Sequence, residues 1–247
     1  MLSINNISIY DTKTNTQILD SVTLDIKQHE MVAIVGGSGG GKTVLANMIL
    51  NNLPKTLCAS GNIKWEQPQG LDNQHNKKAA LISQHASSLN PNLTIGSQLK
   101  LFTQGSIQLH QLLRLLGLSS HILSAYPYQL SGGIVKRVLT CMALVQRSYL
   151  VVADEPTCGL DEANAVQLMT LYKSWSKLAS SFLIISHDLP LVCQFVDRVF
   201  VMNDGAIVEQ TTPSRIIKGH CHSYTQVLWQ SQPRHWHRQE FSHRSGV

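Results

Sequence analysis

The sequence predicts an α/β fold built on a mainly parallel central sheet. Continuous apolar runs, which suit parallel strands covered on both faces, occur at residues 31–35, 79–82, 149–153 and 182–185. Helical patterns follow these runs at residues 42–53, 136–146, 162–178 and 189–195. A chain that alternates strands and helices in this way builds a parallel sheet with helices on its faces.

The first segment of the chain follows a different pattern, because its apolar and polar residues alternate. Residues 3–10 and 22–26 read as half-buried strands, and the turn-prone residues 11–17 lie between them. We therefore expect an antiparallel β subdomain at the N-terminus, added to the main sheet.

The middle of the chain is rich in Gln, Ser, His and Leu. Residues 107–118 form a leucine-rich amphipathic pattern that is typical of a helix. These features predict a short helical subdomain over residues 85–147, inserted into a single domain that spans residues 1–247.

The C-terminal part contains a hairpin signal, because the pair Asp204-Gly205 lies between the apolar runs 198–202 and 206–209. One short helix is expected after Thr212-Pro213, since proline suits the first turn of a helix. Residues 211–247 are thus expected to form a C-terminal helix and a His-rich tail.

The composition favours a cytosolic protein. The chain has 247 residues, of which 43% are hydrophobic, so a sizeable core can form. Its formal charge of +5 comes from basic residues spread along the chain, and no nucleic-acid partner is expected. Five cysteines without a CxxC pair fit a reducing compartment. The sequence also has no signal-peptide pattern and no apolar window of the roughly 18 residues that a membrane span requires.

The segment GGSGGGKT, which follows the first apolar run and opens a helix, predicts a phosphate-binding loop. Its glycines let backbone amides turn inward and, with the helix N-terminus, cradle the β- and γ-phosphates of ATP. Lys42 would neutralise phosphate charge, and the Thr43 hydroxyl would coordinate Mg²⁺. The alternative is a glycine-rich turn without a ligand. The loop residues are Gly36, Gly37, Ser38, Gly39, Gly40 and Gly41.

Two neighbouring carboxylates end another predicted strand. Asp154 closes the apolar run 149–153, which places it at the edge of the sheet where ligands bind in open α/β folds. We expect it to hold Mg²⁺, directly or through water. Glu155 follows at once and is suited to act as the general base that polarises the attacking water. A pair of solvated acids at a strand end is the alternative.

With LSGGI at residues 130–134 and SHD at residues 186–188, the chain resembles the ATP-binding cassette (ABC) family over nearly its whole length. The resemblance implies a P-loop NTPase fold and an ATPase driven by ATP and Mg²⁺. It also implies a site completed by a second ATPase subunit, because the signature segment approaches an ATP held by the opposite copy. The residues concerned are Ser131, Gly132 and Gly133.

The resemblance assigns roles to four further residues. Gln84 matches the glutamine that contacts Mg²⁺ and reports the γ-phosphate to a transmembrane partner. His187 matches the switch histidine at the γ-phosphate, and Asp161 lies in the segment that crosses the dimer interface. Tyr10 is similar to the aromatic residue that stacks on adenine. The alternatives are ordinary polar positions for Gln84 and His187, and an ordinary strand-edge residue for Tyr10.

Several stretches are similar to one branch of the family, the ATPases of peptide and nickel importers. They are IVGGSG at residues 34–39, SLNPNLTIG at 88–96, AYPYQLSGG at 125–133 and HSYTQVL at 222–228. The chain also departs from this branch: Ile134 replaces Gln or Met, and Lys136 stands where Gln is usual. The interval between Gln84 and Leu130 is short for the branch, which bears on the docking surface for the membrane partner.

The resemblance thus implies a peripheral ATPase subunit on the cytoplasmic face of the inner membrane. Its expected partners are a second ATPase subunit, more often a different chain than a second copy, two transmembrane permease subunits and, indirectly, a substrate-binding protein. Nickel is expected as cargo ahead of short peptides, partly because of the segment IVEQ at residues 207–210. The alternatives are a nucleic-acid-handling cassette ATPase, an importer of another solute, and a P-loop kinase or GTPase.

The His-rich tail offers six side chains that could bind Ni²⁺ or Zn²⁺, but their spacing defines no closed tetrahedral site. A solvated polar tail is therefore the preferred interpretation. The six residues are His220, Cys221, His222, His235, His237 and His243.

Overall fold

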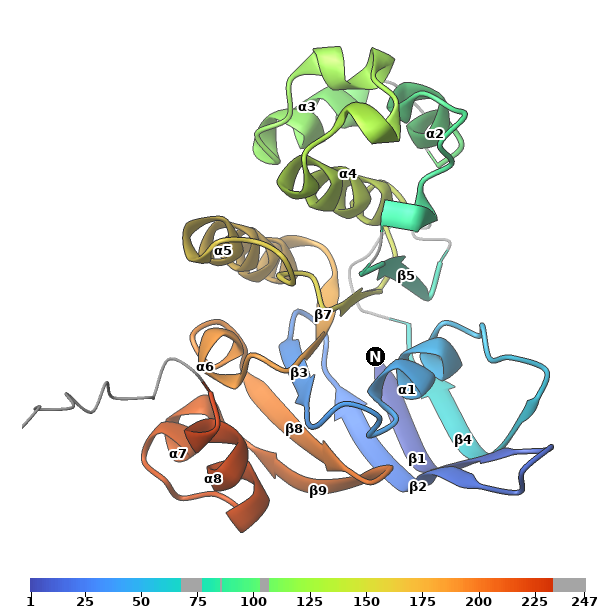
Figure 1. Cartoon of the computed structure of the whole chain (residues 1–247), viewed down its shortest axis with the longest axis vertical. Coiled ribbons are helices and arrows are strands. Elements are labelled where there is room, and N and C mark those ends of the chain that lie inside the picture. The colour runs from blue at the N-terminus through green and yellow to red at the C-terminus, as the bar shows by residue number, and fades with distance from the viewer. Residues whose placement is uncertain (68–76, 85, 103–106, 233–247) are drawn as a thin grey trace, which may run out of the picture.

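A computed structural model describes residues 1–67, 77–84, 86–102 and 107–232, which form two sheets and their flanking helices (Figure 1). The main sheet has the strand order β5-β6-β7-β3-β8-β9. Neighbouring strands are parallel except for β8 and β9, which form an antiparallel hairpin at one edge. The strands are β3 (Met31–Val35), β5 (Ala79–Ile82), β6 (Leu150–Asp154), β7 (Ser181–Ser186), β8 (Arg198–Asn203) and β9 (Ala206–Thr211).

The smaller sheet is antiparallel and has the order β2-β1-β4. It consists of β1 (Leu2–Asp11), β2 (Gln17–Ile26) and β4 (Leu57–Trp65). The burial of β1 alternates along the strand, as the sequence pattern predicts for a sheet with one covered face.

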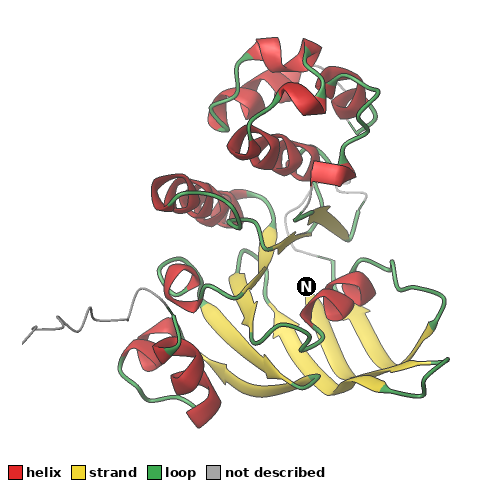
Figure 2. Ribbon diagram, in the orientation of Figure 1, coloured by secondary structure: helices red, strands yellow, loops and turns green. Residues whose placement is uncertain are grey.

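The helices occupy distinct positions around the main sheet (Figure 2). Those that follow β3 and β5 are α1 (Lys42–Ile49), α2 (Ile95–Lys100), α3 (Ile107–Leu115) and α4 (Gly132–Leu144). The remainder are α5 (Glu162–Leu178), α6 (Leu189–Val192), α7 (Pro213–Ile217) and α8 (Ser223–Gln230). There are also three short 3-10 turns. The turn η1 (Ala86–Ser88) precedes α2, and η2 (Ser120–Ser124) and η3 (Pro127–Gln129) lie between α3 and α4.

The two faces of the main sheet enter different cores because side chains alternate along each strand. Ala33 of β3 and Ile184 of β7 belong to the cluster that includes α3, α4 and α5. Their neighbours Ile34 and Ile185 belong to the cluster formed with α1 and the antiparallel sheet. The main sheet is therefore covered on both faces, which explains why its strands read as continuous apolar runs.

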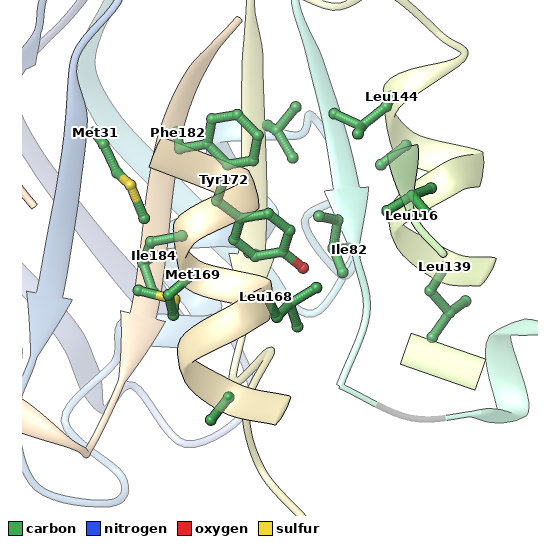
Figure 3. Packing of buried hydrophobic residues seen from close by; sticks show 14 of the residues in the cluster. Met31, Ile82, Leu116, Leu139, Leu144, Leu168, Met169, Tyr172, Phe182 and Ile184 are labelled. Atoms are coloured by element: carbon green, nitrogen blue, oxygen red, sulfur yellow. The ribbon is translucent and has the colours of Figure 1, made fainter. Parts of the chain in front are cut away.

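Tyr172 of α5 contacts both the main sheet and helix α4 within the buried core (Figure 3). Its ring stacks on Phe182 of β7 with centroids 5.1 Å apart. Its hydroxyl forms a 2.9 Å hydrogen bond with the Thr140 hydroxyl of α4, and both side chains are fully buried. The Thr140 hydroxyl donates to the carbonyl oxygen of Lys136 at 2.8 Å, so it accepts from Tyr172; this bond satisfies the buried tyrosine hydroxyl and joins α4 to α5.

The predicted fold class is confirmed, while several element boundaries differ. The 162–178 helix and the Asp204-Gly205 hairpin are found as expected, and both turn residues have positive φ. Strand β4 was not anticipated, because its exposed face is polar and it contains Gly61. The expectation of one helix after Thr212 was wrong: α7 and α8 follow, separated by a turn with Gly219 at φ 73°.

All five cysteines are free in the structure. Cys141 and Cys193 are buried, and burial raises the pKa of each thiol to about 12. No helix within the described residues is both long and apolar enough to span a bilayer.

Arg198 ties the two sheets together at the start of β8. Its guanidinium donates to Asp25 of β2 at 3.0 Å and to Glu30 in the turn before β3. Its side chain is 16% exposed and that of Glu30 is 10% exposed. The Arg198–Glu30 pair is shielded from water, whereas the Asp25 side chain is 47% exposed, so removal of the arginine would leave an uncompensated charge mainly at Glu30.

Replacing Arg198 by methionine should lower the free energy of unfolding by about 2–3 kcal/mol, because the shielded Glu30 carboxylate loses its partner. Urea unfolding at neutral pH measures this change. The matched control is Arg114→Met at an exposed position of α3, which should change stability by less than about 0.5 kcal/mol.

The same variant has a pH signature. Hydrogen bonding to Arg198 lowers the pKa of Asp25, so this contribution is present above the unfolded carboxyl pKa of about 4 and is lost as pH falls through the folded value. The parent protein should therefore lose more stability than Arg198→Met between about pH 5 and pH 3. Parallel losses in both proteins would contradict the role of the ion pair.

Candidate functional site

The loop between β3 and α1 has the shape of an anion cradle. A Cβ at Gly36 would lie 2.0 Å from the carbonyl oxygen of Met202, so only glycine fits where the loop leaves the sheet. Gly41 is the N-cap of α1 with φ 90°, and no side chain caps this helix. The first amides of α1 have no partner inside the helix and can donate to a bound anion.

Lys42 adds a buried positive charge to the cradle. Its side chain is 8% exposed, and Nζ donates to the carbonyl oxygens of Gly36 at 3.0 Å and Gly37 at 2.7 Å. Burial lowers the pKa of Lys42, while the charges of Glu155 and Asp154 oppose this shift. A desolvated ammonium of this kind gains from an anionic partner, so the loop fits a phosphate chain.

The structure brings Thr43 and Asp154 together at the carboxyl edge of the sheet. The Thr43 hydroxyl lies 3.4 Å from Oδ2 of Asp154. A hydroxyl and a carboxylate oxygen beside a phosphate cradle are the oxygen ligands that Mg²⁺ takes in nucleotide sites. The structure brings the two side chains close together, and their role as shared Mg²⁺ ligands stays a prediction.

Glu155 and His187 are in direct contact. Nδ1 of His187 lies 2.8 Å from Oε1 of Glu155, and the glutamate side chain is 14% exposed while the histidine side chain is 66% exposed. Glu155 has φ 46°, a left-handed conformation that is unusual for a glutamate. Strained backbone at a pair of titratable groups is typical of functional positions.

Gln84 lies just beyond the end of β5, the strand that neighbours β6. Its carbonyl oxygen accepts a 2.6 Å hydrogen bond from Nζ of Lys136. The same ammonium reaches the carbonyl oxygen of Glu155 at 3.4 Å. Gln84 and Glu155 are thus linked through a residue of α4.

The signature residues do not join this site. Ser131 is the N-cap of α4, and Ser131 and Gly133 line a separate cavity of about 500 Å³ together with Asp161. Asp161 caps α5, and its two carboxylate oxygens accept from the main chain and the side chain of Asn164. These hydrogen bonds lower the pKa of Asp161 and give it a structural role.

Tyr10 lies on β1, where it pairs with Gln17 of β2. The next part of β2 approaches the phosphate cradle, since a Cβ at Gly41 would lie 2.5 Å from Cδ2 of Leu19. The Tyr10 side chain is 38% exposed. It is available on a strand near the cradle, and its contact with adenine stays a prediction.

Helix α8 contributes two contacts that the sequence reasoning missed. The hydroxyl oxygen of Tyr224 accepts a 3.2 Å hydrogen bond from the Gly37 amide. Nε2 of Gln232, just beyond the helix, donates to the carbonyl oxygen of His187 at 3.0 Å. The segment HSYTQVL contained the signal for the first contact, but only the folded chain places it beside the loop.

The described part of the tail does not form a metal site. No group of three or more His, Cys, Asp or Glu side chains within the described residues converges to hold a metal ion. His220, Cys221 and His222 line a shallow cavity of about 460 Å³ with Glu209. His235, His237 and His243 lie outside the described residues.

A comparison with protein families matches the ABC transporter model over residues 19–158. The chain belongs to the ABC transporter family. The matched segment includes the phosphate loop, the signature residues and the Asp154-Glu155 pair, so the ABC assignment covers most of the site. As a cassette of this family, the chain binds and hydrolyses ATP.

Similar curated proteins are ATP-binding subunits of importers. Dipeptide transport ATP-binding protein DppD of Haemophilus influenzae is 34% identical over 94% of this chain and 78% of the relative. Oligopeptide transport ATP-binding protein AppD of Bacillus subtilis is 32% identical over 94% of this chain and 78% of the relative. Metal-staphylopine import system ATP-binding protein CntD of Staphylococcus aureus is 29% identical over 92% of both chains.

Solved ABC cassettes share the fold. The ADP conformation of a cassette from an ABC transporter superposes with a TM-score of 0.75 and 21% identity, covering 94% of this chain and 99% of that chain. A dimeric cassette in a post-hydrolysis state gives a TM-score of 0.72 and 24% identity, covering 86% and 99%. These similarities confirm the ABC ATPase fold.

Replacing Lys42 by alanine should weaken ATP binding by about 30-fold or more, because a desolvated charge contact typically contributes 2–5 kcal/mol. Calorimetric titration of the purified chain measures this loss. Lys13→Ala, at an exposed lysine of the β1–β2 turn, is the matched control and should leave affinity unchanged. Unchanged affinity in Lys42→Ala would remove the phosphate-loop assignment.

Proposed function

We propose that this chain is the ATP-hydrolysing subunit of an importer of short peptides. The observation that carries the proposal is the match along nearly the whole chain to ATP-binding proteins named for dipeptide and oligopeptide transport. The geometry supports it, because a glycine-rich loop with a buried lysine, a Thr43–Asp154 contact suited to Mg²⁺ and a Glu–His contact share one edge of the main sheet.

Each residue of this edge has a proposed task. The loop amides and Lys42 would hold the phosphates, and Thr43, Asp154 and Gln84 would hold Mg²⁺. Bound Mg²⁺-ATP supplies the terminal phosphoanhydride bond that water cleaves. Glu155 would accept the proton of that water, and His187 would orient the glutamate through the 2.8 Å contact.

The site would be completed by a second ATPase subunit. Ser131 and Asp161 face a separate cavity instead of this chain's own phosphate loop. In our proposal they contact an ATP held by the partner, which is a different ATPase chain or a second copy. A site shared between two subunits would explain why the signature residues lie apart from the phosphate loop of the same chain.

Ser131→Arg should abolish hydrolysis in the assembled pair while leaving ATP affinity of the isolated chain within about twofold of the parent, since the residue acts across the interface. Ser120→Arg, at an exposed position of η2, is the control of equal charge and size. Paired ATPase assays and nucleotide titrations separate the two effects. A loss of ATP affinity in the isolated chain would count against the dimer.

The membrane location follows from partners in this proposal. Two permease subunits would hold the chain at the cytoplasmic face of the inner membrane, and a substrate-binding protein would deliver cargo from the other side. The helical region at residues 85–147, which carries α2, α3 and α4, is the proposed docking subdomain. Residues 211–247 would form a separate C-terminal segment that includes α7 and α8.

Import of a metal complex is the second candidate, and one observation favours it. The relative named for metal-staphylopine import is matched over 92% of both chains. Free nickel, which the sequence favoured ahead of peptide, has less support, because none of the relatives described above is named for nickel. The described tail residues also converge on no metal site.

Deleting the gene in its native host tests the cargo. We expect loss of uptake of a labelled dipeptide, restored by the parental chain and not by Lys42→Ala. Nickel and cobalt accumulation should be unchanged. Normal dipeptide uptake together with reduced metal accumulation would overturn the peptide assignment in favour of a metal complex.

A further inference from the structure

Lys136 places a buried ammonium next to the carboxyl edge of the main sheet, where the residues proposed for hydrolysis lie. It lies in the second turn of α4, and its side chain is 8% exposed. Nζ donates to the carbonyl oxygen of Gln84 at 2.6 Å and to that of Glu155 at 3.4 Å. Both acceptors belong to residues with proposed roles in hydrolysis, and they follow the neighbouring strands β5 and β6.

A lysine in this position is costly, so its presence requires a physical reason. Burial lowers the pKa of Lys136, and the nearby Cys158, Glu155 and Asp154 oppose the shift. Transfer of an ammonium from water to a protein interior costs several kcal/mol unless its donors are satisfied. Here main-chain carbonyls accept from the ammonium at two positions, and the nearby carboxylates offset only part of the burial cost, since the pKa of Lys136 remains lowered.

The main chain of Glu155 needs external support. Its φ of 46° is a left-handed conformation that is strained for a residue with a Cβ. The Glu155 amide donates to Ile185 at 2.9 Å, and its carbonyl accepts from the Cys158 amide at 3.2 Å as well as from Lys136. Lys136 supplies the one side-chain contact in this set, so it can influence where the carboxylate points.

We propose that Lys136 is a positioning residue that sets the main chain of Gln84 and Glu155 and thereby aims the Glu155 carboxylate at His187. This inference rests on the proposed function, in which Glu155 is the base. Lys136 also lies close to the signature residues, because α4 begins at Gly132 and Lys136 follows one turn later. In this proposal a displacement of α4 would reach the main chain of Gln84 and Glu155 through the Lys136 ammonium as well as through the core packing.

A purely space-filling role predicts a different result from a positioning role. Methionine matches the length and volume of the lysine stem but has no N–H donor, so it fills the same space. Glutamine is one bond shorter and neutral, yet it keeps two donors that can reach main-chain carbonyls. The two variants separate packing from hydrogen bonding.

The test measures steady-state ATP hydrolysis by the full chain assembled with its partner. Lys136→Met should lower kcat by about 10-fold or more, because a small misplacement of a base has a large effect on rate. Its KM for ATP should stay within about twofold, since the phosphate cradle is untouched. Lys136→Gln should keep kcat within about threefold of the parent, and Lys218→Met is the exposed control.

A double-mutant cycle with Glu155→Gln shows whether Lys136 acts through Glu155. If it does, Lys136→Met should cause less than about twofold further loss in the Glu155→Gln background. An equal loss in both backgrounds, a parental kcat in Lys136→Met, or a Lys136→Gln as slow as Lys136→Met would overturn the proposal. A thermal melt confirms folding, and Lys136→Leu, which is also apolar and has no N–H donor, replaces Lys136→Met in the cycle if the latter does not fold.

The proposed function can fail separately in the same experiment. Glu155→Gln should hydrolyse ATP at least about 100-fold more slowly than the parent, because an amide cannot accept the proton. A parental rate in this variant would remove Glu155 as the base and with it the role of Lys136. If Glu155→Gln is slow but Lys136→Met causes the same loss of kcat in both backgrounds, Glu155 remains the proposed base and only the positioning role of Lys136 is overturned.

Discussion

The parallel register of β3, β7 and β6 is the constraint on which the site depends. Val35 of β3 pairs with Ser186 of β7, and Ile185 of β7 pairs with Asp154 of β6. The residue after each strand end is Gly36, His187 or Glu155, so three chemical functions leave the sheet at nearly one level. A slip of one residue in β6 would reverse the faces of its side chains and separate the glutamate from the histidine.

This register is held from both faces of the sheet. Alternate side chains of β3 pack toward the helices or toward the antiparallel sheet, so neither face can shift without opening a core. Arg198 adds an electrostatic link between β8 and the turn that leads into β3. The close approach of Gly36 to Met202 in β8 then fixes where the phosphate loop begins. Stability and site geometry therefore share the same contacts.

The sequence was sufficient for the parts of the fold that depend on local chemistry. The apolar runs identified the parallel strands, and the GGSGGGKT segment identified the cradle, because each signal lies within a few consecutive residues. Strand β4 and helix α8 were less visible, since β4 pairs with β1 over a long sequence separation and α8 has only a short amphipathic pattern. The contacts of Tyr224 and Lys136 could not be predicted, because they join segments that only tertiary packing brings together.

Helix α4 has a special place in this arrangement, because its two ends serve different parts of the molecule. Its N-terminus presents Ser131 to the cavity that we assign to the partner's nucleotide, while Lys136 contacts the main chain beneath this chain's own base. The Thr140–Tyr172 hydrogen bond joins the middle of α4 to α5, so a displacement of α4 would have to break this buried contact or carry α5 along. One rigid element thus connects two nucleotide sites in the proposed dimer. A buried cation suits this connection, because an ammonium can hold two carbonyl groups at once and loses both bonds when the helix moves away.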